Sequence, residues 1–224
     1  NHEDPAPYLL AFYPELRDLL ADTGVSIEGR PHVGLQLRGT ELAIRTLLLH
    51  HAFHAAYDNF LIGAELEKAF NDTADDFRFE DGLRVNLFRW LTVMLDRVVN
   101  GHLLLEMPDT YSDIQGTHAH DYALALAARI APLIDEYIPA AEIVFLALPA
   151  AGRRTPNTPD LLAAPTGHLD VDALVEAIFG RIRNTMNVGF DVEPSELVVE
   201  FSHHVAYMIN RLRYSLHVER TVDE

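Results

Sequence analysis

The stretches WLTVMLDRV (residues 90–98) and HVAYMINRL (residues 204–212) decide how this sequence is organised. Each spaces its apolar residues as an amphipathic helix does. The two stretches begin 114 residues apart, and the first carries Trp90 where the second carries His204. The presence of two nearly identical helical patterns in one chain predicts an internal repeat.

The similarity extends upstream of both helices. LIGAELEKAFND (residues 61–72) aligns with LVEAIFGRIRNT (residues 174–185), and FRFED aligns with FDVEP at the same offset of 113 residues. After a one-residue insertion, the polar pair DR of the first helix matches NR of the second. Apolar spacing alone makes any two amphipathic helices look alike, but the matched polar pair and the collinear upstream match favour duplication.

The rest of the chain predicts an all-α protein that begins with a small hairpin. VSIEG and VGLQLRG alternate apolar and polar residues around a short polar turn, as hairpin strands do. Thr40 is a predicted N-cap of the next helix. Pro149 lacks a backbone donor, so we expect a bend or an early end there. The predicted helices cover residues 8–22, 41–60, 61–73, 82–100, 118–137, 140–151, 169–187 and 194–216.

A proline-rich loop, RRTPNTPDLLAAPTG, separates the two copies of the repeat. Such composition is typical of a linker. The second copy extends only 20 residues beyond His204, whereas the first continues some 60 residues past Trp90, so we expect the second to be truncated. The predicted division is 1–50 (helix and hairpin), 55–155 (first module), 156–167 (linker) and 168–224 (second module, N-terminal part).

Composition narrows the classes of function. The formal net charge of −17 opposes binding of nucleic acid by this chain alone, because an acidic surface repels phosphate backbones. There is no cysteine, which fits a reducing compartment, and no apolar run reaches the ~18 residues of a membrane span. These features predict a cytoplasmic protein without a membrane partner, and no motif calls for a cofactor.

Both copies resemble the first conserved block of the PTS regulation domain, or PRD. The resemblance rests on FEDGLRVNLFRWLTVMLDRVVNG and VEPSELVVEFSHHVAYMINRLRYSL, where that block has a histidine and then Asn-Arg-Leu some six residues on. YALALAARIAPLIDEYIPAAEIVFLAL is similar to the second block of the domain. GVSIEGRPHVGLQLRGTELAIRTLLL is similar to the segment that joins a winged-helix domain to the first PRD in the activator branch, and is unlike the RNA-binding module of BglG-type antiterminators.

The resemblance implies a fragment of a bacterial transcription regulator of sugar-utilisation genes, and not an enzyme. Its expected partners are the phosphocarrier protein and enzyme II components of the phosphotransferase system, which phosphorylate PRD histidines and switch a homodimer. DNA contact would belong to a domain outside this chain.

His204 matches the phosphoacceptor position of the second module. Arg211 follows it by seven residues, which places both side chains on one helix face and makes Arg211 the predicted phosphate-supporting residue. His203 would point about 100° away. A half-buried structural histidine is the alternative interpretation of His204.

The first module departs from the family pattern. Its two acceptor positions hold Trp90 and Pro149, neither of which accepts a phosphoryl group. We therefore expect these to be degenerate positions, with Trp90 filling the site with apolar bulk. His102, His118 and His120 are further candidate acceptors in this module.

Two alternatives stay open. His50 and His54 lie four residues apart on one predicted helix face, as ligands of a metal-dependent helical-bundle hydrolase do, but no Glu lies between them as in zincins and no third ligand is evident. The duplicated helices are also consistent with a helical dimerisation module that is never phosphorylated.

Overall fold

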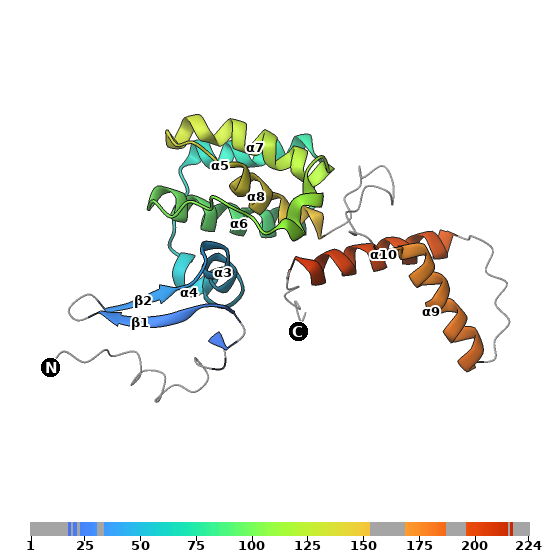
Figure 1. Cartoon of the computed structure of the whole chain (residues 1–224). Helices are drawn as coiled ribbons and strands as arrows, with labels where there is room; N and C mark the ends of the chain where they lie inside the picture. Colours follow the sequence, from blue (N-terminus) through green and yellow to red (C-terminus); the bar gives the residue numbers. More distant parts are fainter. Residues whose placement is uncertain are drawn as a thin grey trace.

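The structure is a computed structural model. It describes residues 18, 20–21, 23–30, 34–152, 169–186, 196–214 and 216. This part of the chain contains eight α-helices and one two-stranded hairpin (Figure 1). The mostly helical class predicted from the sequence is therefore confirmed. The predicted linker 156–167 lies outside the described residues, as does almost all of the helix predicted over 8–22.

The predicted hairpin is present near the N-terminal end of the described chain. Strand β1 (Ser26–Arg30) pairs antiparallel with β2 (Gly34–Arg38), and Ile27 lies opposite Leu37. Both side chains pack against a small apolar cluster that the following helix shares. Alternation along the strands thus puts one face of the hairpin on that helix.

The helix predicted over 41–60 is wrong as a single element. Helix α3 (Glu41–Leu47) begins as expected, because Thr40 Oγ1 accepts a hydrogen bond from the Ala43 backbone at 3.2 Å. A π-helical turn (Leu48–Ala52) follows, and then α4 (Phe53–Tyr57). A π turn inserts one residue. Leu49 and Tyr57 are eight residues apart, and on an ideal α-helix their side chains would point about 80° apart. Because the π turn adds one residue, both side chains face the core.

Four helices form the bundle at the centre of the molecule: α5 (Ala64–Asp76), α6 (Asp81–Val99), α7 (His118–Ile134) and α8 (Ala140–Ala151). Helix α5 packs on α7, and both α6 and α7 pack on α8. Between α6 and α7 the chain forms a short 3-10 helix, η2 (Asp109–Ile114). The apolar faces meet in one continuous core.

Some helix ends differ from the predicted ranges by up to three residues. Helix α7 was expected to reach residue 137 but ends at Ile134, because Asp135 adopts the left-handed conformation with φ 53°. That conformation closes helices, and aspartate tolerates it better than most residues. Helix α8 does not end early at Pro149, because it continues through that residue to Ala151, where the predicted range also ends.

Helices α9 (Val171–Met186) and α10 (Glu196–Arg213) pack against each other beside the bundle, on the side away from the hairpin (Figure 1). Val175 of α9 lies buried with Val205 and Ile209 of α10. No helix among the described residues is long and apolar enough to cross a membrane.

Candidate functional site

Helix α10 carries the predicted acceptor on its solvent face. Val205 and Ile209 are buried against α9, whereas His204 is exposed. Met208 and Leu212, four and eight residues after His204, are 46% and 74% exposed and extend the same face. The imidazole is thus accessible to a docking protein, and the interpretation of His204 as a half-buried structural residue does not fit this position.

Arg211 lies at the other end of this face. Seven residues separate it from His204, a rise of about 10.5 Å along the axis. Arg211 is half-buried, and its aliphatic stem lies close to Gly152. A Cβ atom added to Gly152 would lie 3.3 Å from the Cγ atom of Arg211. The same Cβ would lie 2.6 Å from Leu216 Cδ1. Gly152 therefore permits the close approach between the end of α8 and the end of α10.

Polar contacts fix the C-terminal end of α10 on the bundle. Asn210 is fully buried, and its Nδ2 donates to the Ala151 carbonyl at 3.1 Å. The Tyr214 hydroxyl donates to Asp113 of η2 at 2.7 Å, and Arg213 forms an ion pair with the same carboxylate at 2.7 Å. Burial, and then the bond to Asp113, raise the pKa of Tyr214. Arg213 thus serves this interface and does not point toward His204.

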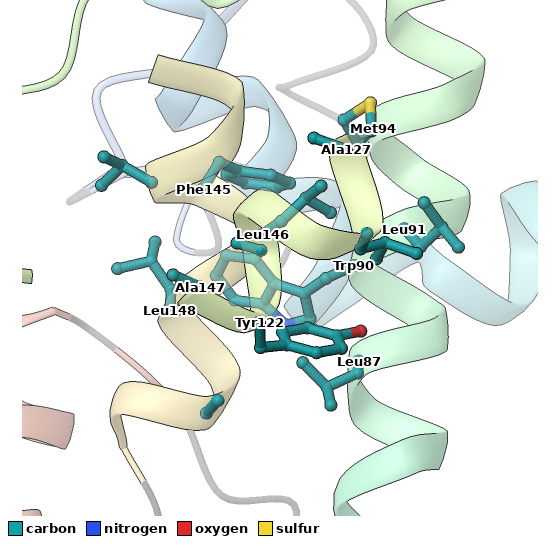
Figure 2. Close-up of a cluster of buried hydrophobic side chains, with 14 of the residues drawn as sticks. Leu87, Trp90, Leu91, Met94, Tyr122, Ala127, Phe145, Leu146, Ala147 and Leu148 are labelled. Atoms are coloured by element: carbon teal, nitrogen blue, oxygen red, sulfur yellow. The ribbon is translucent and has the colours of Figure 1, made fainter. Parts of the chain in front are cut away.

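The matching positions of the first module lie inside the core. Trp90 is 4% exposed, and its ring centroid is 4.6 Å from that of Phe145 on α8. Figure 2 shows its indole among the buried side chains contributed by α6, α7 and α8. Pro149 is also buried, near the end of α8. Both positions are therefore buried in the core of the bundle.

The further candidate histidines lie apart from these positions. His118, at the start of α7, packs its ring 5.0 Å from Phe77, and His120 is half-buried on the same helix turn. His102 is exposed after α6, and its carbonyl accepts from Arg45. The structure does not bring any of them to the face that holds His204.

The histidine pair considered as a metal site has other contacts. His54 Nδ1 lies 3.0 Å from Asp58, and its Nε2 lies 3.2 Å from an Nη of Arg89. His50 lies within the π turn, which alters the simple four-residue helical relation between the two rings. Within the described ranges there is no group of three or more histidine, cysteine, aspartate or glutamate side chains placed to hold a metal ion.

A buried ionic network, which sequence reasoning missed, joins α3 to α8. Arg45 and Glu142 are both completely buried, and the guanidinium binds the carboxylate with two hydrogen bonds, one of them 2.7 Å long. The Arg45 Nε donates to Glu41 at 2.9 Å. The Leu104 backbone donates to Glu142 at 2.8 Å. In the sequence, Arg45 and Glu142 each interrupt an otherwise apolar helical run. Two opposite charges in such runs are the sequence feature that could have predicted this buried ion pair.

The network continues to α6. Arg97, which the repeat aligns with Arg211, donates two hydrogen bonds of 2.8 Å to Glu41. Burial raises the pKa of Glu41, but hydrogen bonds from Arg97 and Arg45 outweigh it, and the pKa lies below its ordinary value. The hydroxyl of Tyr57 donates to Asp96 at 2.9 Å. The arginine of the first module is therefore a structural residue.

Comparison with known protein families, with curated proteins and with solved structures finds no match to this chain.

Proposed function

We propose that this chain is the regulatory part of a bacterial transcription regulator, in which His204 accepts a phosphoryl group from proteins of the phosphotransferase system. The observation that carries the proposal is the contrast between the two matched positions: His204 faces solvent on α10, whereas Trp90 lies in the core. The resemblance of both helices to the PRD block supplies the donor class. The donors are the phosphocarrier protein and enzyme II components.

The transfer needs only an accessible nitrogen and a phosphorylated donor. The lone pair of a neutral ring nitrogen of His204 attacks the phosphorus of a donor phosphohistidine, a new N–P bond forms, and the donor N–P bond breaks. The donor imidazole leaves with the electron pair, so one imidazole is exchanged for another without an oxidant or a cofactor. An exposed acceptor suits this reaction, because two protein surfaces have to meet at the phosphorus.

Charge on the same face decides where the new group settles. A phosphorylated side chain carries about two negative charges. Glu200, one turn before His204, repels that charge, whereas Arg211, two turns after it, attracts it. We therefore expect the phosphoryl group to turn toward Arg211, which packs beside Gly152 at the junction with the bundle. Phosphorylation would act on that junction.

Phosphopeptide mapping tests the acceptor. The chain is incubated with enzyme I, the phosphocarrier protein and labelled phosphoenolpyruvate, and the label is located by mass spectrometry. We expect label on His204 that is lost in His204→Ala and kept in the matched control His203→Ala. Arg211→Gln should slow labelling, while Arg181→Gln, an exposed position on α9, should not. Label on the first module with His204 unlabelled would overturn the proposal.

Self-association without phosphorylation is the second candidate function. Met208 and Leu212 form an exposed apolar stripe beside His204, a feature typical of interaction surfaces. A two-fold interface on this stripe would bring the His204 side chains of the two subunits close together, because both subunits contribute the same surface patch to such an interface. Sedimentation velocity of Met208→Asp with Leu212→Asp separates the candidates: loss of dimer with unchanged labelling assigns the stripe to dimerisation alone.

A further inference from the structure

A pocket of about 420 Å³ opens between α4, α5 and α6, away from the proposed acceptor. Its volume lies within the range of ligand-binding clefts in proteins, which is about 300 to 1,000 Å³. Aromatic rings offer a ligand a large apolar contact area and prefer defined ring geometries. Five aromatic side chains line this pocket: Phe53, Tyr57, Phe60, Phe70 and Phe88.

The aromatic walls are held in place by their own contacts. The rings of Phe70 and Phe88 meet edge to face at 5.1 Å. The Tyr57 ring lies 5.3 Å from that of Phe53 and 5.7 Å from that of Phe60. Rings positioned in advance favour an aromatic ligand, because little side-chain entropy is lost when it binds.

The two arginines that border the pocket are already bound by the protein. Arg84 forms an ion pair with Asp75 at 2.6 Å. The Arg89 guanidinium lies over the Phe53 ring, with its Cζ 5.2 Å from the ring centroid, and one of its Nη atoms lies 3.2 Å from His54 Nε2. Since these contacts occupy both guanidinium groups, the arginines belong to the wall of the pocket and do not make it an anion site.

Two polar side chains of α5 border the same pocket and are available to a ligand. Glu67 and Asn71 lie four residues apart and therefore share one face of the helix. Both are exposed, and neither side chain forms a hydrogen bond or an ion pair within the part of the chain that the structure describes. A carboxylate and an amide oxygen both accept hydrogen bonds, so this side of the pocket suits a ligand that carries an N–H donor.

We propose that this pocket binds a small, neutral, planar aromatic compound with an N–H donor, of the indole class. The ring enters among the aromatic side chains, and its N–H donates to the Glu67 carboxylate, with Asn71 as a second polar contact. A charged ligand fits less well, because Glu67 repels an anion and the two guanidinium groups repel a cation. The site is separate from His204 and does not rest on the proposed function.

Four probes test the proposal by titration calorimetry and ligand-observed NMR on the full chain: indole, benzofuran, indole-3-carboxylate and tryptamine. Benzofuran has the ring shape of indole but an oxygen in place of the N–H. We expect saturable binding of indole, with each of the other three at least about threefold weaker. Equal binding of indole and benzofuran, tighter binding of either charged compound, or no saturable binding of indole would overturn the proposal. This comparison uses the unaltered protein and does not depend on how any variant folds.

Variants of Glu67 test the hydrogen bond. Glu67→Leu should lower the affinity for indole to that of benzofuran, whereas Glu67→Gln, which keeps an oxygen acceptor, should retain an intermediate affinity. Glu65→Leu is the matched control, because Glu65 is exposed on the same helix but does not line the pocket, and its affinity for indole should be unchanged. An equal loss of affinity in Glu65→Leu and Glu67→Leu would contradict the assigned contact.

A second pair of variants locates the binding. Val85→Trp, at a 59% exposed position on the pocket wall, should block indole binding. Leu124→Trp, at a 43% exposed position on α7, should leave it unchanged. If Val85→Trp folds, as judged by its circular dichroism, and binds indole as the unaltered chain does, the pocket is not the site.

Discussion

Replacing Arg45 with methionine should be among the most destabilising single changes in this protein. Arg45 is completely buried and binds Glu142 with two hydrogen bonds, Glu41 with one of 2.9 Å, and the His102 carbonyl with one of 2.9 Å. Methionine fills much of the same volume but supplies no donor. The Glu142 carboxylate then stays buried without its cationic partner and keeps the hydrogen bond from the Leu104 backbone.

The expected cost follows from that unpaired charge. Breaking a buried ion pair by removing one partner costs about 3 to 5 kcal/mol, because the other charge stays in a medium that solvates it poorly. We expect about 4 kcal/mol for Arg45→Met. Glu142→Gln keeps an acceptor for Leu104 and leaves Arg45 with Glu41 and the His102 carbonyl, so we expect about 2 kcal/mol.

The double variant Arg45→Met with Glu142→Gln distinguishes a buried pair from two independent losses. In the double variant a neutral amide replaces the buried carboxylate, so no uncompensated charge remains beside the methionine. The double variant should therefore lower the free energy of unfolding by at least about 1.5 kcal/mol less than the sum of the two single changes. Urea unfolding followed by circular dichroism at 222 nm gives each free energy of unfolding. A cost of less than about 1 kcal/mol for Arg45→Met, or strict additivity in the double variant, would refute the reasoning.

Three further predictions concern the core, the ionic network and the junction. Trp90→Ala should lower the free energy of unfolding by about 4 kcal/mol, because it empties a buried site, whereas Val99→Ala, 65% exposed on the same helix, should cost less than about 0.5 kcal/mol by the same urea assay. The pKa of Glu41 is lowered in the folded state, so the ionised side chain stabilises the fold at pH values above the unfolded-state pKa of 4.5. This stabilisation is lost as the pH falls through the folded-state pKa. In acid titrations, Glu41→Gln should therefore flatten the dependence of the free energy of unfolding on pH below about pH 4.5. Tyr214→Phe removes the hydrogen bond to Asp113 and should raise hydrogen exchange at the end of α10 severalfold, and unchanged exchange there would show that the contact does not hold the helix.

Local patterns in the sequence account for most of the elements. Apolar spacing placed α6 and α8 within one residue at each end, and alternation located the hairpin strands. Thr40 was identified as an N-cap because that preference depends on a side chain and the backbone three residues away. These features depend on neighbours in the chain, which the sequence displays directly.

The candidate site was only partly accessible to the same reasoning. Spacing placed His204 and Arg211 on one helix face, and the repeat set Trp90 beside His204 in the alignment. Whether each position faces core or solvent depends on which other helix covers it. Helix α8 covers Trp90 with Phe145, while His204 lies on a face of α10 that α9 does not cover. No local pattern carries that information.

The amino-acid sequence by itself determined the helical character, the hairpin and the alignment of the two related helices, because periodicity and capping act over a few residues. Tertiary structure alone decided the pairing of Arg45 with Glu142, residues 97 positions apart, and the π turn that brings Leu49 and Tyr57 into one core. Burial of a charge is tolerated only where its partner arrives from elsewhere in the chain. Such contacts therefore depend on how the helices pack, which no local sequence pattern displays.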